Sequence, residues 1–311
     1  MATETFQTLI DKNRRNSVIL ILVFLALFAG VGMLIGLAWG RGNSRFGVIV
    51  AAGAGAVAFV LTMISYYGGS SILLGMSSAR EVTHNDDPQL FNVVEELCLA
   101  GGMPVPRVYL IDDTAMNAFA TGRDPKHAAV AITTGLRSRL KRDELQGVMA
   151  HELSHVRHND ILYAMLVSVM VGVLVMLCDV FLRSTFWGRS SRRRDDRESG
   201  GGAFQLVLLL LAVVLAIIAP ILAKIIQMSI SRQREYLADA GSVELTRNPE
   251  GLIGALAALS ADTDVLEVAN RATAPLYIVH PIKTFEERAE SIFDTHPPIR
   301  DRIARLRSPE V

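Results

Sequence analysis

Near the middle of this 311-residue chain, residues 147–155 read GVMAHELSH. If this stretch is helical, His151 and His155, four positions apart, leave the same face. Two imidazoles placed in this way can hold one metal ion. Glu152 follows the first histidine and lies beside the ion's open position, where its carboxylate can take a proton from water. The alternative is a surface helix that carries two solvated histidines.

A candidate third ligand lies far along the chain, in residues 234–239, which read REYLAD. The spacing of four puts Glu235 and Asp239 on one helical face. Zn²⁺ accepts two neutral imidazoles and a carboxylate, so Glu235 can complete the site. Asp239 can accept the N–H of a ligating histidine and so fix its tautomer. The alternative is a pair of solvated acids among basic neighbours.

His158 lies three positions beyond His155, roughly on the same helical face. A fourth protein ligand would close the site and block the activation of water. We therefore expect His158 on the membrane-proximal surface and not at the metal.

The apolar residues gather in four blocks, each long enough to cross a hydrocarbon layer about 30 Å thick. The first two carry no charge and are separated by a short Arg-bearing turn, which favours a retained helical hairpin over a cleaved signal peptide. The other two contain Asp179 and Lys224 near a segment end, where each can reach the interface. Whether these two blocks span is left open. The blocks are Ser17–Trp39, Phe46–Tyr67, Ile161–Leu182 and Ala203–Met228.

The candidate ligands constrain the topology of the third and fourth blocks. Two crossings or none keep His155 and Glu235 on one aqueous side, whereas a single crossing would separate them. If both blocks cross and the N-terminus is cytoplasmic, the arginine-rich loop 183–202 lies outside, against the positive-inside tendency. We divide the chain into an N-terminal transmembrane hairpin (1–68), a first half of the catalytic domain with the zinc helix (69–160), the third and fourth blocks (161–228) and a second half (229–311).

Composition limits the class of partner. Thirty-one Lys and Arg residues balance thirty-one Asp and Glu residues, so we expect no surface for nucleic acid. The chain is 50% hydrophobic and only 20% charged, which is apolar for a soluble protein and favours the lipid bilayer as a partner. Two cysteines, Cys98 and Cys178, cannot build a disulfide framework.

Local signals predict the elements around the central helix. Asp87 and Pro88 mark the start of a helix that Gly101 and Gly102 stop. Two runs rich in β-branched residues, each bounded by turn formers, predict strands. The predicted strands are Arg107–Ile111 and Ala128–Thr133, and further helix starts are expected at Asp143–Glu144, near Pro249 and after Pro298.

In the order of its elements, the chain resembles the membrane zinc metalloproteases of the HtpX type, relatives of the CAAX prenyl proteases. The resemblance covers the uncharged hairpin, the Asn-Ala-Phe-Ala-Thr-Gly segment at Asn117–Gly122, the HELSH helix, the Glu-x-x-x-Asp helix, and His296-Pro297-Pro298 with a downstream Arg302. It implies the glutamate-zincin (gluzincin) arrangement. In that arrangement His151, His155 and Glu235 hold zinc, and Glu152 is the general base and acid.

The resemblance also implies roles outside the ligand set. Asn117 and Ala118 resemble a substrate-binding edge, whose unpaired N–H and C=O groups suit pairing with an extended peptide. His296 resembles a residue that steadies the oxyanion, and Arg302 one that orders the site or the substrate. The alternatives are a turn residue, a helix cap and a solvated face, respectively. Arg300 stands where the family commonly has an acid, so ion pairs carried over to this helix stay open.

We therefore predict an α+β membrane protein with four hydrophobic helices and a zincin-like catalytic domain that contains a small sheet. The predicted activity is that of a metalloendopeptidase with one Zn²⁺ per chain, acting on membrane proteins or membrane-proximal segments. The resemblance implies quality control of misfolded membrane proteins by a multi-pass protein of the cell (inner) membrane, with its active site facing the cytoplasm. Two alternatives remain: a selective processing protease of the prenyl-protein type, and a non-catalytic membrane adaptor stabilised by zinc.

Overall fold

The computed structural model describes residues 6–40, 42–170, 172, 232–262, 264, 278 and 297–308. Several sequence predictions fall outside these residues and are not tested by the structure. They are the fourth apolar block, most of the third, the arginine-rich loop 183–202, and the residues Cys178, Asp179, Lys224 and His296.

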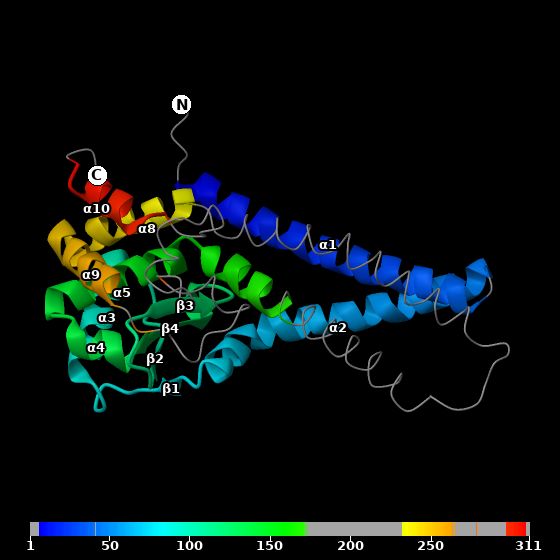
Figure 1. The fold of residues 1–311 in the computed structure, drawn as a ribbon, viewed down its shortest axis with the longest axis horizontal. Coiled ribbons are helices and arrows are strands. Elements are labelled where there is room, and N and C mark those ends of the chain that lie inside the picture. Colours follow the sequence, from blue (N-terminus) through cyan, green and yellow to red (C-terminus); the bar gives the residue numbers. More distant parts are fainter. Residues whose placement is uncertain are drawn as a thin grey trace.

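Two long helices form a hairpin that projects from the rest of the fold (Figure 1). Helix α1 spans Phe6–Trp39 and α2 spans Ser44–Met76. Asn43 caps α2, its side chain accepting from the backbone N–H of Arg45 at 3.0 Å. The helices approach so closely that a Cβ on Gly36 would lie 2.7 Å from the Cα of Gly47.

The surface of this hairpin is apolar. Val18, Leu22 and Ile49 are at least half exposed, and only 22% and 17% of the most apolar windows of α1 and α2 are buried. A core helix of a soluble domain would hide its apolar side chains. Within the described residues, these two helices are long and apolar enough to cross a membrane, as the first two blocks predict.

The third apolar block begins as a helix that packs on the hairpin. This helical segment, Asp160–Met170, buries Tyr163, Leu166 and Val167 in a cluster with Leu20 and Phe24 of α1. The described part of the block is therefore covered by protein on at least one side.

The small sheet is mixed and has four strands in the order β1-β2-β4-β3. Strands β2 and β4 pair in parallel, whereas β1–β2 and β3–β4 are antiparallel. The predicted strands are confirmed with the expected bounds. The strands are β1 Arg80–Glu81, β2 Arg107–Ile111, β3 Ala118–Gly122 and β4 Ala128–Thr133.

The predicted N-terminal signal of α3 is confirmed. Helix α3 spans Pro88–Gly101, and the carboxylate of Asp87 accepts from the backbone N–H of Leu90 at 3.1 Å. Gly102 ends the helix in the left-handed conformation, with φ of 62°. The same Asp87 carboxylate binds Arg137 through two contacts, at 2.6 and 2.9 Å. This pair ties α3 to α4, which spans Thr134–Arg139.

The sheet lies between helices on both faces (Figure 1). One face packs on α3 and α5, burying residues such as Leu97, Val130 and Leu153. The other face receives the end of α2, where Leu74 meets Ile111 and Phe119. Helices α8 and α9 pack on α5, and α10 packs on α8 and α9. The bounds of these four helices are α5 Arg142–Arg157, α8 Arg232–Thr246, α9 Pro249–Ala261 and α10 Ile299–Leu306.

The described chain is thus mostly helical, with a small mixed sheet and two candidate membrane helices. The predicted helix starts at Asp143–Glu144, Pro249 and after Pro298 are confirmed within about one residue. The two-residue strand β1 was not predicted. A strand this short depends on its pairing with β2 and carries little signal of its own.

Helix α5 can approach α9 only because residue 147 is glycine. A Cβ at Gly147 would lie 2.5 Å from the backbone nitrogen of Leu252, so we expect Gly147→Ala to destabilise the fold by about 1–3 kcal/mol. The measurement is the thermal unfolding midpoint of the detergent-solubilised protein. Gly75→Ala in α2 is the control, since a Cβ there meets nothing within 4 Å. Equal midpoints for the two variants would contradict this close packing.

Candidate metal centre

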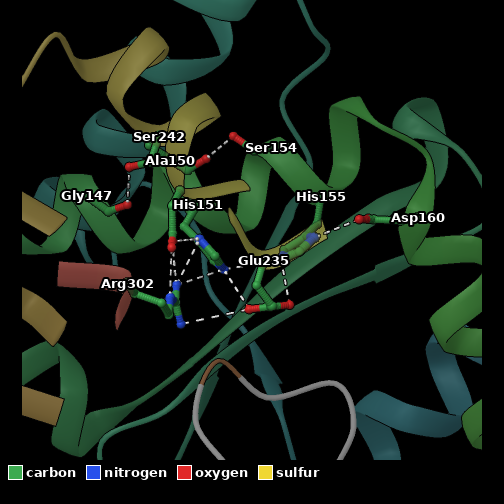
Figure 2. Close-up of polar contacts among 10 residues, drawn as sticks. Gly147, Ala150, His151, Ser154, His155, Asp160, Glu235, Ser242 and Arg302 are labelled. Atoms are coloured by element: carbon green, nitrogen blue, oxygen red, sulfur yellow. Dashed lines mark hydrogen bonds and ion pairs between the residues drawn. The ribbon is translucent and has the colours of Figure 1, made fainter. Parts of the chain in front are cut away.

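Helices α5 and α8 bring His151, His155 and Glu235 together, although Glu235 lies in the distant second half of the chain (Figure 2). The Nε2 atoms of the two histidines are 3.2 Å apart. The carboxylate oxygens of Glu235 lie 3.6 Å from Nε2 of His151 and 3.7 Å from Nε2 of His155. His151 and Glu235 are buried, and the side chain of His155 is 16% exposed.

Close packing of small residues brings α8 onto α5. A Cβ at Gly241 would lie 2.5 Å from Oγ of Ser154, so only glycine fits between the two helices. One residue further, the hydroxyl of Ser242 donates to the backbone carbonyl of Gly147 at 2.8 Å. Because these two contacts hold α8 close to α5, the side chain of Glu235 can reach the histidines.

The three side chains fit a zinc ion in donor type and in spacing. Zinc takes imidazole nitrogens at 2.0–2.1 Å and carboxylate oxygens at 2.0–2.2 Å in a tetrahedral arrangement, which places neighbouring donors about 3.4 Å apart. The two Nε2 atoms, 3.2 Å apart, are close to that value, while one carboxylate oxygen of Glu235 lies 3.6 Å from His151 and the other lies 3.7 Å from His155. With one ligand atom taken from each residue, the three atoms lie within 4.8 Å of one another. Three protein ligands leave the fourth tetrahedral position for water or substrate.

Each histidine is oriented by a carboxylate on its other ring nitrogen. Nδ1 of His151 lies 3.0 Å from Asp239, and Nδ1 of His155 lies 2.8 Å from Asp160. Such partners fix the tautomer and leave Nε2 free to ligate. The structure places Asp239 where the sequence prediction expects it. Asp160 was missed, and its available signal was an acid five residues after the second histidine, directly before an apolar block.

Arg302 enters the centre from α10 and is almost fully buried. Its guanidinium donates to both carboxylate oxygens of Asp239, at 2.9 and 2.6 Å. A nitrogen of the same group lies 3.8 Å from Glu235. The solvated-face alternative for Arg302 is therefore wrong, while Arg300 on the same helix is exposed.

The carboxylates around the two histidines favour positive charge in the centre. Burial by itself lowers the pKa of a histidine, yet the carboxylates of Asp160, Glu235 and Glu152 raise the pKa of His155 to about 10. The pKa of His151 is also raised, since Asp239 and Glu235 outweigh burial and Arg302. The carboxylates therefore favour protonated, positively charged imidazoles. A divalent cation bound to neutral imidazoles would supply this positive charge instead.

Glu152 lies in the same buried helical turn, with 2% of its surface exposed. Burial raises the pKa of its carboxyl group, against the opposing effect of the two histidines. The side chain is thus sequestered from bulk solvent beside the candidate ligands.

Asn117 and Ala118 lie at the start of β3, the edge strand of the sheet. The backbone of Asn117 pairs inward, its carbonyl accepting from Thr133 at 3.0 Å. Because inward and outward residues alternate along an antiparallel strand, Ala118 and Ala120 direct their backbone groups away from β4, to the side where no described strand pairs. All five residues of β3 are buried. In the structure the N–H of Ala118 donates to the side chain of Asn117, and its carbonyl accepts from Ile278, both at 3.0 Å.

The approach to β3 is held by a network that was not predicted. The carboxylate of Asp262 accepts from the backbone N–H of Met116 at 2.6 Å and binds Arg139 at 2.8 Å. No local pattern signals this contact, because its partners lie far apart in the sequence.

His158 ends α5 and does not join the cluster of candidate ligands. Only 3% of its surface is exposed, so the expected surface position is wrong. The backbone carbonyl of His158 accepts from the side-chain amide of Asn13 in α1 at 3.3 Å, and burial lowers the pKa of its imidazole to about 4. The N-terminal part of α1 covers this residue.

Comparison with known proteins defines the class to which the fold and the centre belong. Residues 84–310 match the peptidase family M48. The chain belongs to this family and is a metallopeptidase, and its two long apolar helices indicate a membrane protein.

The relatives specify the type within the family. The chain is 43% identical to the protease HtpX homologue of Ligilactobacillus salivarius, over 96% of this chain and 97% of that protein. It is 40% identical to the protease HtpX homologue of Thermoanaerobacter pseudethanolicus, with 99% of both chains covered. Among solved structures, Ste24p of S. mikatae shares 17% identity at a TM-score of 0.47, covering 96% of this chain and 67% of that one. The resemblance to the HtpX type is confirmed.

The carboxylate that orients His155 can be tested with zinc. We expect Asp160→Asn to weaken zinc binding about 10–100-fold, because the imidazole loses the partner that fixes its ring. The measurement is competition for zinc with a chelator of known affinity. Asp143→Asn is the control, since it makes the same chemical change at an exposed position of α5, the helix that carries His155. Unchanged zinc affinity in Asp160→Asn would show that His155 does not need this partner.

Proposed function

We propose that the protein is a zinc-dependent endopeptidase in which His151, His155 and Glu235 hold one Zn²⁺. The observation that carries this proposal is the convergence of two imidazoles and one carboxylate from distant parts of the chain, with one ligand atom from each lying within 4.8 Å of the others. When bound there, zinc would lower the pKa of a water molecule to about 7 and polarise the scissile carbonyl.

Glu152 is the proposed general base and acid. Its carboxylate accepts a proton from the attacking water and returns it to the leaving amine, so that the hydrolysis of the peptide bond balances. The buried position of Glu152 keeps bulk water from competing for this proton. Asp239, Asp160 and Arg302 act by holding the imidazoles in place.

A role in catalysis for His296 follows from the resemblance alone, since this residue lies outside the described part of the chain. In that role its imidazole steadies the oxyanion that forms on the scissile carbonyl. His296 directly precedes Pro297 and Pro298, which lead into α10 and Arg302.

The substrate in this proposal is an extended polypeptide that pairs with the outer edge of β3, on the side away from β4. The outward backbone groups of Ala118 and Ala120 supply the hydrogen bonds. A peptide that binds at the Ala118 carbonyl must replace the hydrogen bond from Ile278. Access to this edge therefore includes a competition with the protein's own backbone.

The proposed setting is the cell (inner) membrane, with the metal centre on the cytoplasmic side. Helices α1 and α2 supply two spans, and the third and fourth apolar blocks complete the four hydrophobic helices of a gluzincin-type membrane protease. Membrane proteins and membrane-proximal segments are then the nearest substrates, and quality control of misfolded membrane proteins is the proposed cellular role. A selective processing protease and a zinc-stabilised adaptor are the competing outcomes of the tests below.

Removal of the proposed base should separate catalysis from metal binding. We expect Glu152→Gln to lower the turnover of an unfolded model membrane protein by about 10²–10⁴-fold while zinc content stays at one ion per chain. Glu250→Gln, at an exposed position in the first turn of α9, is the matched control. Equal turnover in both variants would remove Glu152 from the mechanism, and zinc binding without turnover in the wild type would favour the adaptor.

The orientation can be tested with single cysteines in a variant that lacks Cys98 and Cys178. We expect Ser44→Cys, at the exposed first residue of α2, next to the turn between α1 and α2, to react with a membrane-impermeant maleimide in intact cells. Glu250→Cys, on the side of the metal centre, should react only after the cells are opened. The reverse pattern would overturn the cytoplasmic placement.

A further inference from the structure

Apart from the metal centre, a polar pocket lies at the end of the sheet away from Asn117, where α2 meets the turn between β3 and β4. Its volume of about 200 Å³ exceeds the roughly 30 Å³ share of one water molecule several-fold. The residues of its wall that matter here are Tyr66, Tyr67 and Ser70 from α2, Arg107 from β2, and Arg123 and Lys126 from the turn.

The level of this pocket relative to the membrane can be estimated from the length of the uncharged part of α2. The uncharged run Phe46–Tyr67 is about 33 Å long as a helix, close to the thickness of the hydrocarbon layer. Tyr66 and Tyr67 therefore stand where aromatic residues mark the membrane interface. Given the membrane placement proposed above, the pocket opens at the level of the lipid headgroups.

The pocket wall is positively charged. Arg107, Arg123 and Lys126 line it, and no acidic residue does. The guanidinium of Arg123 lies over the ring of Tyr67, 5.3 Å from its centroid, and 3.6 Å from the nearby Asp124. Asp124 is itself engaged with the ring of His127 at 2.8 Å. Among the described residues, no ion pair involves Arg107 or Lys126, and the guanidinium of Arg107 lies 5.7 Å from the ring centroid of Tyr109. Neither charge is neutralised by a carboxylate within 4 Å in that part of the chain.

A buried hydroxyl adds a hydrogen-bond donor to this charge. Oγ of Ser70 is shielded from solvent and has no hydrogen-bond partner within the described part of the chain. A buried polar atom left without a partner costs about 1–3 kcal/mol. A phosphate oxygen in the pocket would accept from this hydroxyl and would also meet the three cations.

We propose that this pocket binds the phosphate group of an anionic phospholipid headgroup at the membrane surface. Tyr66 and Tyr67 lie at the height of the headgroups, and the cations and Ser70 recognise the phosphate. Inorganic phosphate carries the same chemistry, so the experiment must separate the two sources. The pocket is separate from the metal centre, and binding to it can be measured without any catalytic step.

The test measures binding of dihexanoyl phosphatidylglycerol, a short-chain anionic lipid, to the detergent-solubilised full chain by native mass spectrometry. We expect Arg107→Gln with Lys126→Gln to weaken binding roughly 25-fold, at about fivefold for each basic residue. Ser70→Ala should weaken it about tenfold, through loss of a hydrogen bond to a charged group. Dihexanoyl phosphatidylcholine, which is zwitterionic, should bind at least tenfold more weakly than the anionic lipid.

The matched control is Arg14→Gln with Arg15→Gln, which removes the same charge from exposed positions of α1. We expect this pair to stay within twofold of the wild type. Equal losses in the two double variants would overturn the proposal, because the effect would then be general surface charge. An unchanged affinity in both the Arg107/Lys126 double variant and Ser70→Ala would overturn it as well. Binding of inorganic phosphate as tight as that of the lipid would replace the lipid assignment by free phosphate.

Discussion

The metal centre depends on the compensation of buried negative charge. The carboxylates of Glu152, Asp160, Glu235 and Asp239 are buried around two imidazoles, and Arg302 is a buried cation that contacts this group. Removing a charge from water costs several kcal/mol unless a partner repays it. Arg302 supplies one positive charge beside these carboxylates, and the negative charge around the imidazoles raises the pKa of both histidines. A cation held by His151, His155 and Glu235 would add positive charge at the same place, which would link metal binding to stability.

The parts of the fold that could be predicted from sequence are those with strong local signals. The Asp87–Pro88 start of α3 and the strands Arg107–Ile111 and Ala128–Thr133 are set by capping, turn formers and β-branched side chains within a few residues. The strand Arg80–Glu81 has no comparable signal, because it exists through its partner β2. The close approach of α8 to α5 likewise depends on tertiary contacts. The sequence around Gly241 does not indicate that a glycine is needed there to make room for Ser154.

In the candidate site, too, some residues could be predicted from local sequence signals and others could not. The spacing of His151, His155 and Glu152, and of Glu235 from Asp239, follows from helix periodicity, and metal chemistry supplies the rest. Periodicity cannot say which distant groups complete the environment. The hydrogen bond from Met116 to Asp262 and the one from Ile278 to Ala118 join segments that no local rule connects. For Arg302 the resemblance implied an ordering role, and the solvated-face alternative stayed open because its helix is strongly polar; only the contact with Asp239 decides between them.

The path from the metal centre to the membrane hairpin is only a few residues long. Asp160, which orients His155, is also the first residue of the helical segment that packs on the hairpin. Two positions earlier, the carbonyl of His158 accepts from Asn13 of α1. A shift of α1 against α5 would therefore act on both contacts at once and move the partner of His155. Since these contacts join α5 to the hairpin, the position of the centre relative to the hairpin is set by packed side chains and hydrogen bonds, not by a linker. In the proposed membrane setting, this attachment would hold the centre at a fixed height above the lipid and would favour substrates close to the membrane surface.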